Sequence, residues 1–537
     1  MNTNPCIIKS EELCSTDEFP GIGYEIYNQM KKNRTKIAQY DLETKVEQSY
    51  ETLLEKSIKT ATSLKALKLE KDPTIAIFST NHMDVCVPII GSYFLGYKVN
   101  AYDCFLKESD LTLLLQKIPP SIMFIEEQFV DKIEVAMQLS RVNFKLVVFG
   151  KSDKYTMFND FCQGNSENDS FEVVRLESGQ KTAVIMFSSG TTGLPKGICL
   201  SHNALLKQAF TLVAVQNLST TSVFLHFSSY NWITAPLILF ATLLVGASRV
   251  LALESSAWTA IHECKVTHVY CPPHLTALLL NQIKPDPEKN KSVISYMSAG
   301  SRLSNDLFEE LVRLFPEALV SQSYGQTEAS GWISIFQLTK QEDCSLARKK
   351  PDSVGKIWPG FSCKIVDIAT EEILGPNKTG EIRLNSNSLF MNGYYKSDES
   401  DAYDTTGWLK TGDLGYYDGD ECLYVLDRCK EMLKYRGFHI RPQKLEMILE
   451  SHPAVEKAVV IGVTHQIEGD HPKGIVILKS GKGRDISPED LRSFVDDQVE
   501  ERMKLRAGVQ IVESIPLTST GKPKRRELKQ MVESGLL

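Results

Sequence analysis

The 537-residue chain lacks the patterns that mark several classes of protein. Its twelve cysteines include no C-x-x-C pair, and the closest pairs, Cys264/Cys271 and Cys422/Cys429, have no histidines at zinc-finger spacing. Neither a cysteine metal site nor a disulfide framework is therefore expected, and unpatterned cysteines in a long chain fit a reducing compartment. Positive charge is not in excess, because 60 Lys and Arg against 67 Asp and Glu give a net charge of −7. The chain thus has no electrostatic reason to bind nucleic acid or an anionic membrane.

Targeting signals and membrane spans are also missing from the sequence. Residues 1–9 contain no long apolar run of the kind that marks a signal peptide, and residues 534–537 are not the S-K-L peroxisomal address. We therefore expect a cytoplasmic protein. One apolar run, residues 231–248, contains a proline and a glycine and is short for a bilayer span. For this run we expect a buried helix followed by a strand at 248–253.

The alternation of expected strands and helices indicates an α/β fold. With 42% hydrophobic and 24% charged residues, the chain suits a globular protein of two or three domains. Strand-like runs alternate with longer helical patterns, which is typical of largely parallel sheets. The expected strands include 74–78, 121–125, 144–149, 182–187 and 266–270, and the expected helices include 50–69 and 306–314.

The character of the sequence changes after about residue 350, where turn-forming residues become frequent. Residues 355–384 and 419–426 resemble short strands of a β-rich region. A charged stretch, 427–431, then precedes a smaller unit, and we expect a domain boundary near residue 428. Within that unit we expect helices at 444–451 and 487–502 and strands at 458–463 and 509–512.

The first sign of chemistry follows the expected strand 182–187. Residues 188–197 contain three glycines, four hydroxyls and one lysine. Glycines let backbone N–H groups approach an anion, while hydroxyls and a lysine add donors and positive charge. The loop is not a Walker A motif, because two residues separate the second glycine from the lysine. A polar flexible turn is the alternative, but this combination favours polyphosphate binding by Ser188, Ser189, Gly190, Thr191, Thr192, Gly193 and Lys196.

Residues 188–197 resemble the signature of the acyl-adenylate-forming superfamily, which contains acyl-CoA synthetases, 4-coumarate–CoA ligases, beetle luciferases and peptide-synthetase adenylation domains. Further motifs of that superfamily follow in order at 324–328, 407–413, 427–437 and 520–522. The chain is most similar to the insect luciferase-like acyl-CoA synthetase branch. The resemblance implies an α/β fold with a large N-terminal domain, 1–427, of two α/β subdomains plus a β-barrel. It also implies a small mobile α+β C-terminal domain, 428–537, that rotates about a hinge near 427–431.

The resemblance assigns a first half-reaction, in which ATP and a carboxylic acid form an acyl-adenylate and release pyrophosphate. It implies that Lys522 bridges the carboxylate and the α-phosphate, and that Thr327 and Lys196 contact phosphate groups. Glu328 would hold Mg²⁺, a hard cation suited to carboxylate and phosphate oxygens. For Lys522 a solvated surface lysine is the alternative, because four more basic residues follow within 524–529.

The resemblance also implies the nucleoside contacts. Asp413 would accept the ribose hydroxyls, with Arg428 as a further ribose or phosphate contact. The adenine would stack on Tyr324 beside Gly325. A turn residue is the alternative for Asp413, and a strand-to-turn junction with a buried tyrosine is the alternative for 324–328. A second adenine segment is a weaker match, because many α/β proteins have a small-residue turn after a strand; its residues are Ala299, Gly300 and Ser301.

In the second half-reaction of such ligases, the CoA thiol displaces AMP. Lys434, Arg436 and Gly437 resemble the loop that turns into the site after domain rotation, with the two basic side chains available for CoA phosphates. The start of an amphipathic helix is the alternative for this stretch. ATP, Mg²⁺ and CoA are thus the expected cofactors and co-substrates.

Three departures from relatives concern the acid and the CoA step. Where relatives carry Phe-His at the acyl pocket, this chain has Ser228 or Ser229, and His226 lies two residues earlier. His439 replaces a usual glutamine, and residues 442–446 differ from the common Pro-Ala-Glu-Leu-Glu. These differences put in doubt which acid is used and how efficient the CoA step is.

Three hypotheses follow. The first is an acid–CoA ligase for a fatty or aryl acid, with small-molecule acid and CoA as partners and a monomer or weak oligomer as the expected state. The second is a luciferase-type enzyme that adenylates a luciferin and oxidises it with O₂. The third is a nucleotide-binding protein without turnover, which the presence of Lys522, Glu328 and Asp413 disfavours.

Overall fold

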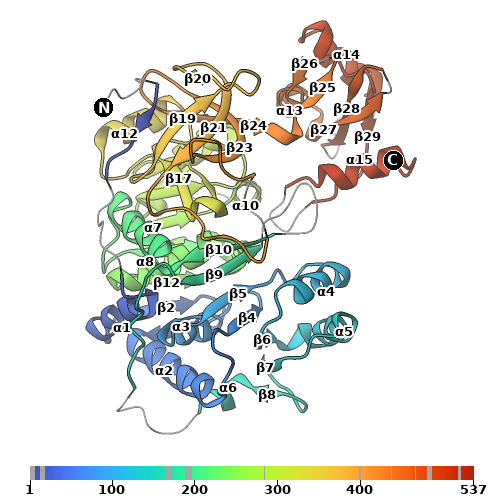
Figure 1. Ribbon diagram of the computed structural model, residues 1–537. Coiled ribbons are helices and arrows are strands. Elements are labelled where there is room, and N and C mark those ends of the chain that lie inside the picture. The colour runs from blue at the N-terminus through green and yellow to red at the C-terminus, as the bar shows by residue number, and fades with distance from the viewer. Residues whose placement is uncertain are drawn as a thin grey trace.

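The computed structural model arranges the chain as stacked α/β layers below, a β-rich layer above and a small C-terminal unit at one side (Figure 1). No helix within the described ranges is long and apolar enough to cross a membrane. The structure describes residues 6–12, 19–163, 171–187, 196–282, 285–397, 401–436, 438–465, 467–479, 486–517 and 522–537.

The first α/β layer is an eight-stranded sheet. Successive side chains along its strands point to opposite faces, and each face packs against an apolar cluster that includes helices. Ile75 and Ile77 face one apolar cluster, while Ala76 and Phe78 face another, as the period of two in a strand requires. The second cluster includes helices α4 (Glu108–Lys117) and α5 (Val130–Ser140). The strand order is β22 (Gly393–Tyr394), β10 (Gly197–Ser201), β9 (Thr182–Phe187), β5 (Lys98–Ala101), β4 (Thr74–Phe78), β6 (Ile122–Glu126), β7 (Lys145–Phe149) and β8 (Thr156–Met157).

The second α/β layer is a seven-stranded sheet whose strands from β15 to β2 run parallel. Their carboxyl ends therefore meet at one edge, which is where ligands bind in open α/β sheets. The apolar run 231–248 forms helix α8 (Thr234–Val245) and strand β12, as expected. The order is β15 (Leu319–Gln322), β14 (Ser295–Ser298), β13 (His268–Tyr270), β11 (Val223–His226), β12 (Ser248–Leu251), β2 (Ile37–Asp41) and β3 (Val46–Ser49).

A curled antiparallel sheet lies above the α/β layers in Figure 1, and the chain also contains a short three-stranded antiparallel sheet. The curled sheet contains β1 (Ile8–Lys9), β19 (Ser362–Val366), β21 (Gly380–Asn385), β23 (Leu409–Tyr417) and β24 (Leu423–Arg428), with β20 (Ile373–Leu374) on β19. The three-stranded sheet contains β16 (Tyr324–Gln326), β17 (Gly331–Ile335) and β18 (Lys356–Ile357).

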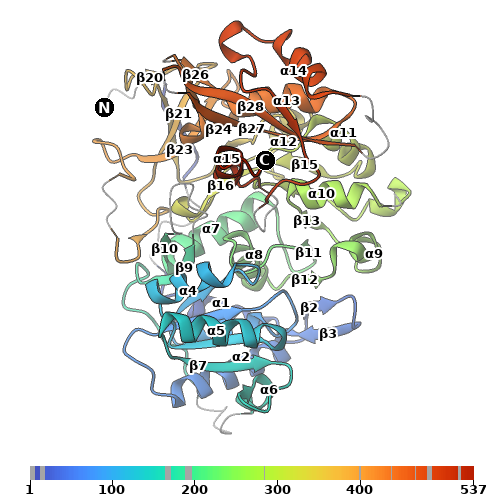
Figure 2. The same cartoon turned by 90° about the vertical axis from the view of Figure 1, so that its right-hand side faces the viewer.

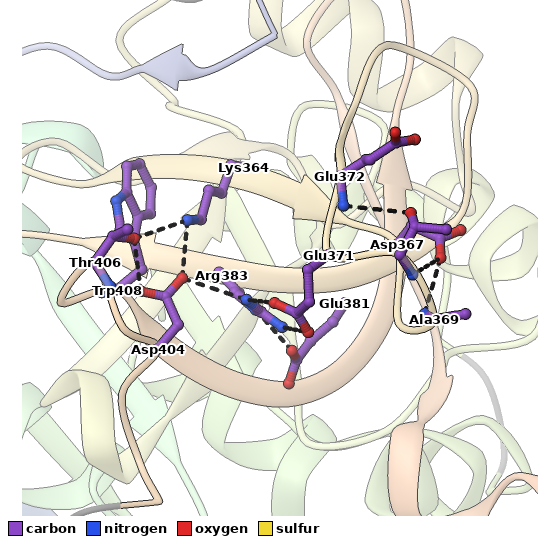
Figure 3. Close-up of polar contacts among 11 residues, drawn as sticks. Lys364, Asp367, Ala369, Glu371, Glu372, Glu381, Arg383, Asp404, Thr406 and Trp408 are labelled. Carbon is purple, nitrogen blue, oxygen red and sulfur yellow. Dashed lines mark hydrogen bonds and ion pairs between the residues drawn. The ribbon is translucent and has the colours of Figure 1, made fainter.

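A buried ion-pair cluster fixes the segment that leads into β23 (Figure 3). Asp404 accepts hydrogen bonds from Lys364 at 2.8 Å and Arg383 at 3.3 Å, and from the backbone N–H groups of Thr406 and Trp408. Arg383 also binds Glu371 with two nitrogens. Such an arrangement orders the turn before the motif 407–413.

The C-terminal unit is a five-stranded sheet with helices α13 (Pro442–Ser451), α14 (Pro488–Asp496) and α15 (Arg525–Glu533). Its strands are β26 (Phe438–Ile440), β25 (Leu433–Tyr435), β28 (Gly469–Leu478) and β27 (Val455–His465), with β29 (Val509–Ile511) on β28. The expected α/β fold with two α/β sheets, a barrel-like sheet and a small C-terminal domain is therefore confirmed.

The helix expected at 487–502 is too long. A capping box between Ser487 and Asp490 begins α14, but the helix ends at Asp496, whose carboxylate accepts the Leu505 N–H at 2.8 Å. Met503 and Leu505 are buried in the same core as the helix residues. Reaching that core takes the chain away from the helix axis, which local periodicity does not reveal.

Candidate active site

Asp413 is buried in strand β23 at the centre of a polar network. Its Oδ2 accepts hydrogen bonds from the Tyr324 hydroxyl at 2.5 Å and from Gln326 Nε2 at 3.0 Å. Its Oδ1 lies 2.8 Å from Arg428 Nε, and the two residues are register partners of β23 and β24. Burial raises the pKa of Asp413, while Arg428 and the Tyr324 hydroxyl act to lower it. Asp413 is therefore a strand residue, and the turn alternative is wrong.

Tyr324 donates a hydrogen bond from its hydroxyl to Asp413. Burial and the Asp413 charge raise the pKa of Tyr324, so the hydroxyl stays protonated and donates. Gln326 also donates to the Thr411 carbonyl at 2.7 Å and was not singled out from the sequence, although it lies inside the motif 324–328. Gly325 pairs with the facing strand, where an added Cβ would lie 2.4 Å from the Gly331 carbonyl oxygen.

Lys522 comes from the far end of the chain and lies within electrostatic reach of this network. It is half-buried, and burial and Arg428 lower the pKa of its ammonium, whereas Asp413 and Glu431 raise it. Conversely, the Lys522 ammonium acts to lower the pKa of Asp413. Lys522 is therefore not a fully solvated surface lysine, and its position is suited to stabilising negative charge beside Asp413.

Glu328 and Lys196 are joined by a residue that the sequence did not indicate, Tyr394. Glu328 lies in a short 3-10 helix, η5 (Thr327–Ala329), and is half-buried. Burial raises its pKa, and hydrogen bonding by the Tyr394 hydroxyl acts to lower it. The Lys196 ammonium lies 4.4 Å from the centroid of the Tyr394 ring. The described end of the phosphate-loop candidate thus lies beside the candidate metal ligand, with half-buried Thr327 next to it.

Most of the phosphate-loop candidates lie outside the described residues. These are Ser188, Ser189, Gly190, Thr191, Thr192 and Gly193, and Gly437 of the CoA-loop candidate is outside as well. The flanks of the loop are described: Phe187 and Gly197 are partners in the antiparallel pair β9–β10. Strand β22 pairs with β10 on the other side and carries Tyr394.

The second adenine candidate follows strand β14 at the carboxyl edge of the seven-stranded sheet. Ala299 is buried, whereas Gly300 and Ser301 are exposed. The Ser323 N–H donates to the Ser298 carbonyl at 2.8 Å, which holds the segment before Tyr324 against the end of β14. The two adenine candidates are therefore neighbours.

The acyl-pocket candidates lie at the same edge, after strand β11. His226 is buried, its Nδ1 has no hydrogen-bond partner in the part of the chain that the structure describes, and burial lowers its pKa to about 3. Ser228 accepts a hydrogen bond from the Thr234 hydroxyl at 3.1 Å, and its carbonyl accepts one from Asn81 at 3.0 Å. A neutral histidine and polar side chains therefore occupy this segment, with Ser229 bonded to Asn231.

Lys434 and Arg436 lie elsewhere, exposed on the C-terminal unit. Lys434 is in strand β25, and its N–H donates to Asp470 at 3.0 Å. The Arg436 Nε donates to Glu468 at 2.7 Å, and Glu468 also binds His471. Because 433–435 and 438–440 are paired antiparallel strands, the helix-start alternative is wrong. The structure does not bring these residues to Asp413, and nothing is described of the His439 side chain.

Comparison with known proteins gives two family matches. The model of the AMP-binding enzyme matches residues 26–395, and that of the AMP-binding enzyme C-terminal domain matches residues 444–522. Among curated relatives, luciferin 4-monooxygenase of Nipponoluciola cruciata is 30% identical, over 91% of this chain and 90% of its own length. A 4-coumarate–CoA ligase-like protein of Arabidopsis thaliana is also 30% identical, over 91% of this chain and 85% of its own.

Solved structures give the same picture. The luciferase-like enzyme from the nonluminescent mealworm Zophobas morio is 34% identical, with a TM-score of 0.75 over 79% of this chain and 99% of that one. ATP-bound MatB from Rhodopseudomonas palustris is 20% identical, with a TM-score of 0.85 over 97% of this chain and 100% of that one. The second similarity concerns the fold alone.

Proposed function

This chain belongs to the AMP-binding enzyme family, and on that premise we propose that it is an ATP-dependent carboxylic acid–CoA ligase. It forms an acyl-AMP from ATP and a fatty or aryl acid and then transfers the acyl group to the CoA thiol. The observation that carries the proposal is that Lys522, from the last segment of the chain, lies within electrostatic reach of the Asp413–Arg428 ion pair of the curled sheet.

The first step joins two anions, and the site supplies positive charge for it. A carboxylate oxygen bonds to the α-phosphorus while the bond to the bridging oxygen of pyrophosphate breaks. Two unit charges 4 Å apart repel by about 1 kcal/mol in water and several-fold more in a partly dry site. Lys522 offsets this repulsion where the acid meets the α-phosphate, and Lys196 does so toward the departing pyrophosphate. Thr327 donates to the α-phosphate.

The nucleoside is held by the network around Asp413. Its carboxylate accepts the ribose hydroxyls; burial raises the pKa of that carboxyl, and the Arg428 charge acts to lower it and so favours the ionised form. The Tyr324 hydroxyl and Gln326 fix the carboxylate from the other side. The Tyr324 ring then offers a flat face to adenine.

A magnesium ion fits the residues around Glu328. Mg²⁺ in such sites takes one or two carboxylates together with substrate phosphates, and Glu328 is a half-buried carboxyl beside the Lys196 end of the phosphate loop. When bound, the ion supplies charge neutralisation on the phosphates. Burial raises the pKa of Glu328, and a bound cation would lower it.

The second step uses the C-terminal domain, 428–537, in another orientation. Lys434 and Arg436 are exposed and lie away from Asp413, so they reach the adenylate only if the domain rotates about 427–431. The CoA thiol attacks the acyl carbonyl and AMP leaves. The two basic side chains bind CoA phosphates.

A luciferase-type reaction is the second candidate. It is favoured by the 30% identity to luciferin 4-monooxygenases, although the 34% identical luciferase-like enzyme comes from a mealworm that is described as nonluminescent. Both candidates share the adenylation residues. Light emission with a luciferin, ATP and O₂ would decide for the second candidate.

The decisive experiment is a screen of pyrophosphate release over acids of varied chain length and aromaticity, with and without CoA. A ligase releases pyrophosphate with a subset of acids and forms the thioester when CoA is present. Release that does not lead to a thioester with any acid contradicts the ligase. Absence of acid-dependent ATP–pyrophosphate exchange for every acid supports a nucleotide-binding protein without turnover.

A further inference from the structure

The segment that carries Lys522 is closed at its base by backbone contacts. Leu517 and Pro523 form an isolated antiparallel bridge, and the Lys524 N–H donates to the Pro516 carbonyl at 2.9 Å. Helix α15 begins at Arg525, immediately after this closure. These two contacts join residues 516–517 to residues 523–524, and an attachment to other elements of the C-terminal unit requires a further residue.

Arg525 makes that attachment through three groups on three other elements. Its Nε lies 2.9 Å from Glu431 Oε2, and its Nη2 lies 3.0 Å from Glu446 Oε2. Its Nη1 also binds Glu446 and donates to the Val460 carbonyl at 2.9 Å. The side chains of Arg525, Glu446 and Glu431 are 20%, 11% and 27% exposed, so these ion pairs are largely shielded from water.

Glu431 connects the Arg525 contact to the candidate active site. Glu431 ends the 3-10 turn η6 (Cys429–Glu431), which follows Arg428, the partner of Asp413. Its charge also raises the pKa of Lys522, so the two side chains are within electrostatic reach. Arg525 therefore connects the base of the Lys522 loop to the turn that joins the two domains. Figures 1 and 2 show α15 on the side of the C-terminal unit that faces the rest of the chain.

The helix itself does not depend on Arg525 for its packing. Leu528 of α15 is fully buried with Val459, Ile461, Ile475 and Ile515. This apolar contact is sufficient reason to expect α15 to stay docked when the arginine is replaced. The charged contact is additional, and it lies three residues from Lys522.

The geometry points to Arg525 as a positioning residue for adenylation: it fixes the base of the 517–523 loop against Glu431 and Glu446, and so delivers the Lys522 ammonium to Asp413. The inference rests on the proposed role of Lys522. A loosely held Lys522 would still contact the bound ATP and acid in some of its conformations. Fewer of these conformations would have the geometry that the transition state needs. Losing the attachment therefore lowers kcat more than it raises KM.

The kinetic test compares Arg525→Met and Arg525→Lys with Arg526→Met, a matched change at the exposed neighbour. For acid-dependent ATP–pyrophosphate exchange we expect Arg525→Met to lower kcat by at least about tenfold, with KM for ATP changed less than about threefold. Arg525→Lys keeps one charge and recovers part of the rate. Arg526→Met stays within about twofold of the parent. Transfer of a supplied acyl-adenylate to CoA should be affected less than about threefold in all three variants.

Lys522→Ala separates the inference from the proposed function. If Lys522→Ala abolishes exchange while Arg525→Met matches the parent, the positioning role is wrong and the adenylation role stands. If Lys522→Ala leaves exchange intact, the proposed role of Lys522 is wrong. An equal loss in exchange and in acyl transfer for Arg525→Met would mean a general structural role and would overturn the inference.

A second measurement does not depend on turnover. An amine-reactive reagent is applied to the folded protein, and labelling is followed by mass spectrometry at Lys522, with exposed Lys434 as the internal reference. We expect labelling of Lys522 relative to Lys434 to rise at least about threefold in Arg525→Met, because a freed loop exposes its half-buried lysine, and to stay unchanged in Arg526→Met. Equal relative labelling in both variants contradicts the inference even if the acid is never found.

Discussion

Arg428 and Asp413 face each other across the last two strands of the curled sheet, with Arg428 Nε 2.8 Å from Asp413 Oδ1. Arg428 is also the last residue of β24, and the connecting turn begins with the next residue. The carboxylate proposed to bind ribose is therefore ion-paired to the edge of the proposed hinge. Nucleotide binding and the orientation of the C-terminal domain share one contact.

Replacing Asp413 by asparagine should weaken ATP binding. The variant keeps the side-chain shape but loses the charge that Arg428 and the ribose hydroxyls need. Charge-assisted hydrogen bonds of this kind contribute about 1.5–3 kcal/mol, so we expect the Kd for ATP to rise by about 10- to 100-fold. Titration calorimetry measures it, with Asp420→Asn in an exposed turn as the control. An unchanged Kd would mean that Asp413 does not contact the nucleotide.

Lys522→Ala should lower the rate of acyl-adenylate formation by at least about a hundredfold, because the reacting anions lose their bridging cation. The same variant should still pass a supplied acyl-adenylate to CoA. The two half-reactions are measured separately, with Lys524→Ala two residues away as the control. Adenylation that persists within a few-fold would mean that Lys522 is misassigned.

Lys434→Ala should have the opposite effect. The residue is exposed on the C-terminal unit, where its N–H binds Asp470, so we expect adenylation within about twofold of the parent. Thioester formation should slow by about tenfold, since a contact to a CoA phosphate is lost. Lys479→Ala, at another exposed position of the same domain, is the control. Equal loss in both half-reactions speaks against a rotating C-terminal domain.

Asp427 gives a prediction about pH and stability. Burial raises its pKa to about 6, although the N–H groups of Arg428 and Gln443 and the charge of Arg525 act to lower it. In the unfolded chain an aspartate has a pKa of about 3.9. The stabilisation from the raised pKa is therefore fully present below about pH 4 and is lost as the pH rises through about 6.

The variant Asp427→Asn removes this titration. Relative to the parent, we expect its free energy of unfolding to increase between pH 4 and 6 by at most about 3 kcal/mol, and the difference to be constant above pH 6.5. Urea denaturation at intervals of pH measures both proteins. A difference that does not change between pH 4 and 7 would show that Asp427 does not titrate in this range.

The ion-pair cluster of Figure 3 gives a prediction about stability alone. Arg383 is 4% exposed and contacts Glu371, Glu381 and Asp404. Arg383→Met removes the cation that the largely buried Glu381 carboxylate contacts and one of the two cations at buried Asp404, and breaking such buried pairs typically costs about 3–5 kcal/mol. We expect a corresponding loss in urea denaturation, whereas the exposed control Lys378→Met changes stability by less than about 0.5 kcal/mol. Equal stability of the two variants would contradict this reading of the cluster.

Much of the architecture could be predicted because local patterns are strong in this chain. Strands 74–78 and 182–187 have the expected bounds, since short apolar runs between turn residues leave little choice. The buried helix at 234–245 was also expected, because its apolar run contains a proline and a glycine and is short for a bilayer span. The end of α14 was missed, since a tertiary contact of Asp496 decides it.

For the site, the order of the motifs carried the prediction. Asp413, Tyr324 and Arg428 were singled out and lie together, and Lys522 joins them. Tyr394 carried no signal, because a tyrosine after a glycine in a short strand is common. Arg525 is one of four basic residues within 524–529. No local pattern distinguishes its half-buried side chain from that of the exposed Arg526.

The sequence by itself determined the α/β class and the order of the family motifs, and it predicts polyphosphate binding by 188–197, because these depend on local residue types and spacing. Tertiary structure alone decided that Lys522 lies within electrostatic reach of Asp413, that Tyr394 contacts both Lys196 and Glu328, and that Arg525 binds Glu431 and Glu446. These contacts join residues far apart in the chain. They depend on how sheets and domains pack, and the local periodicity of the sequence does not predict which charged side chains become partners.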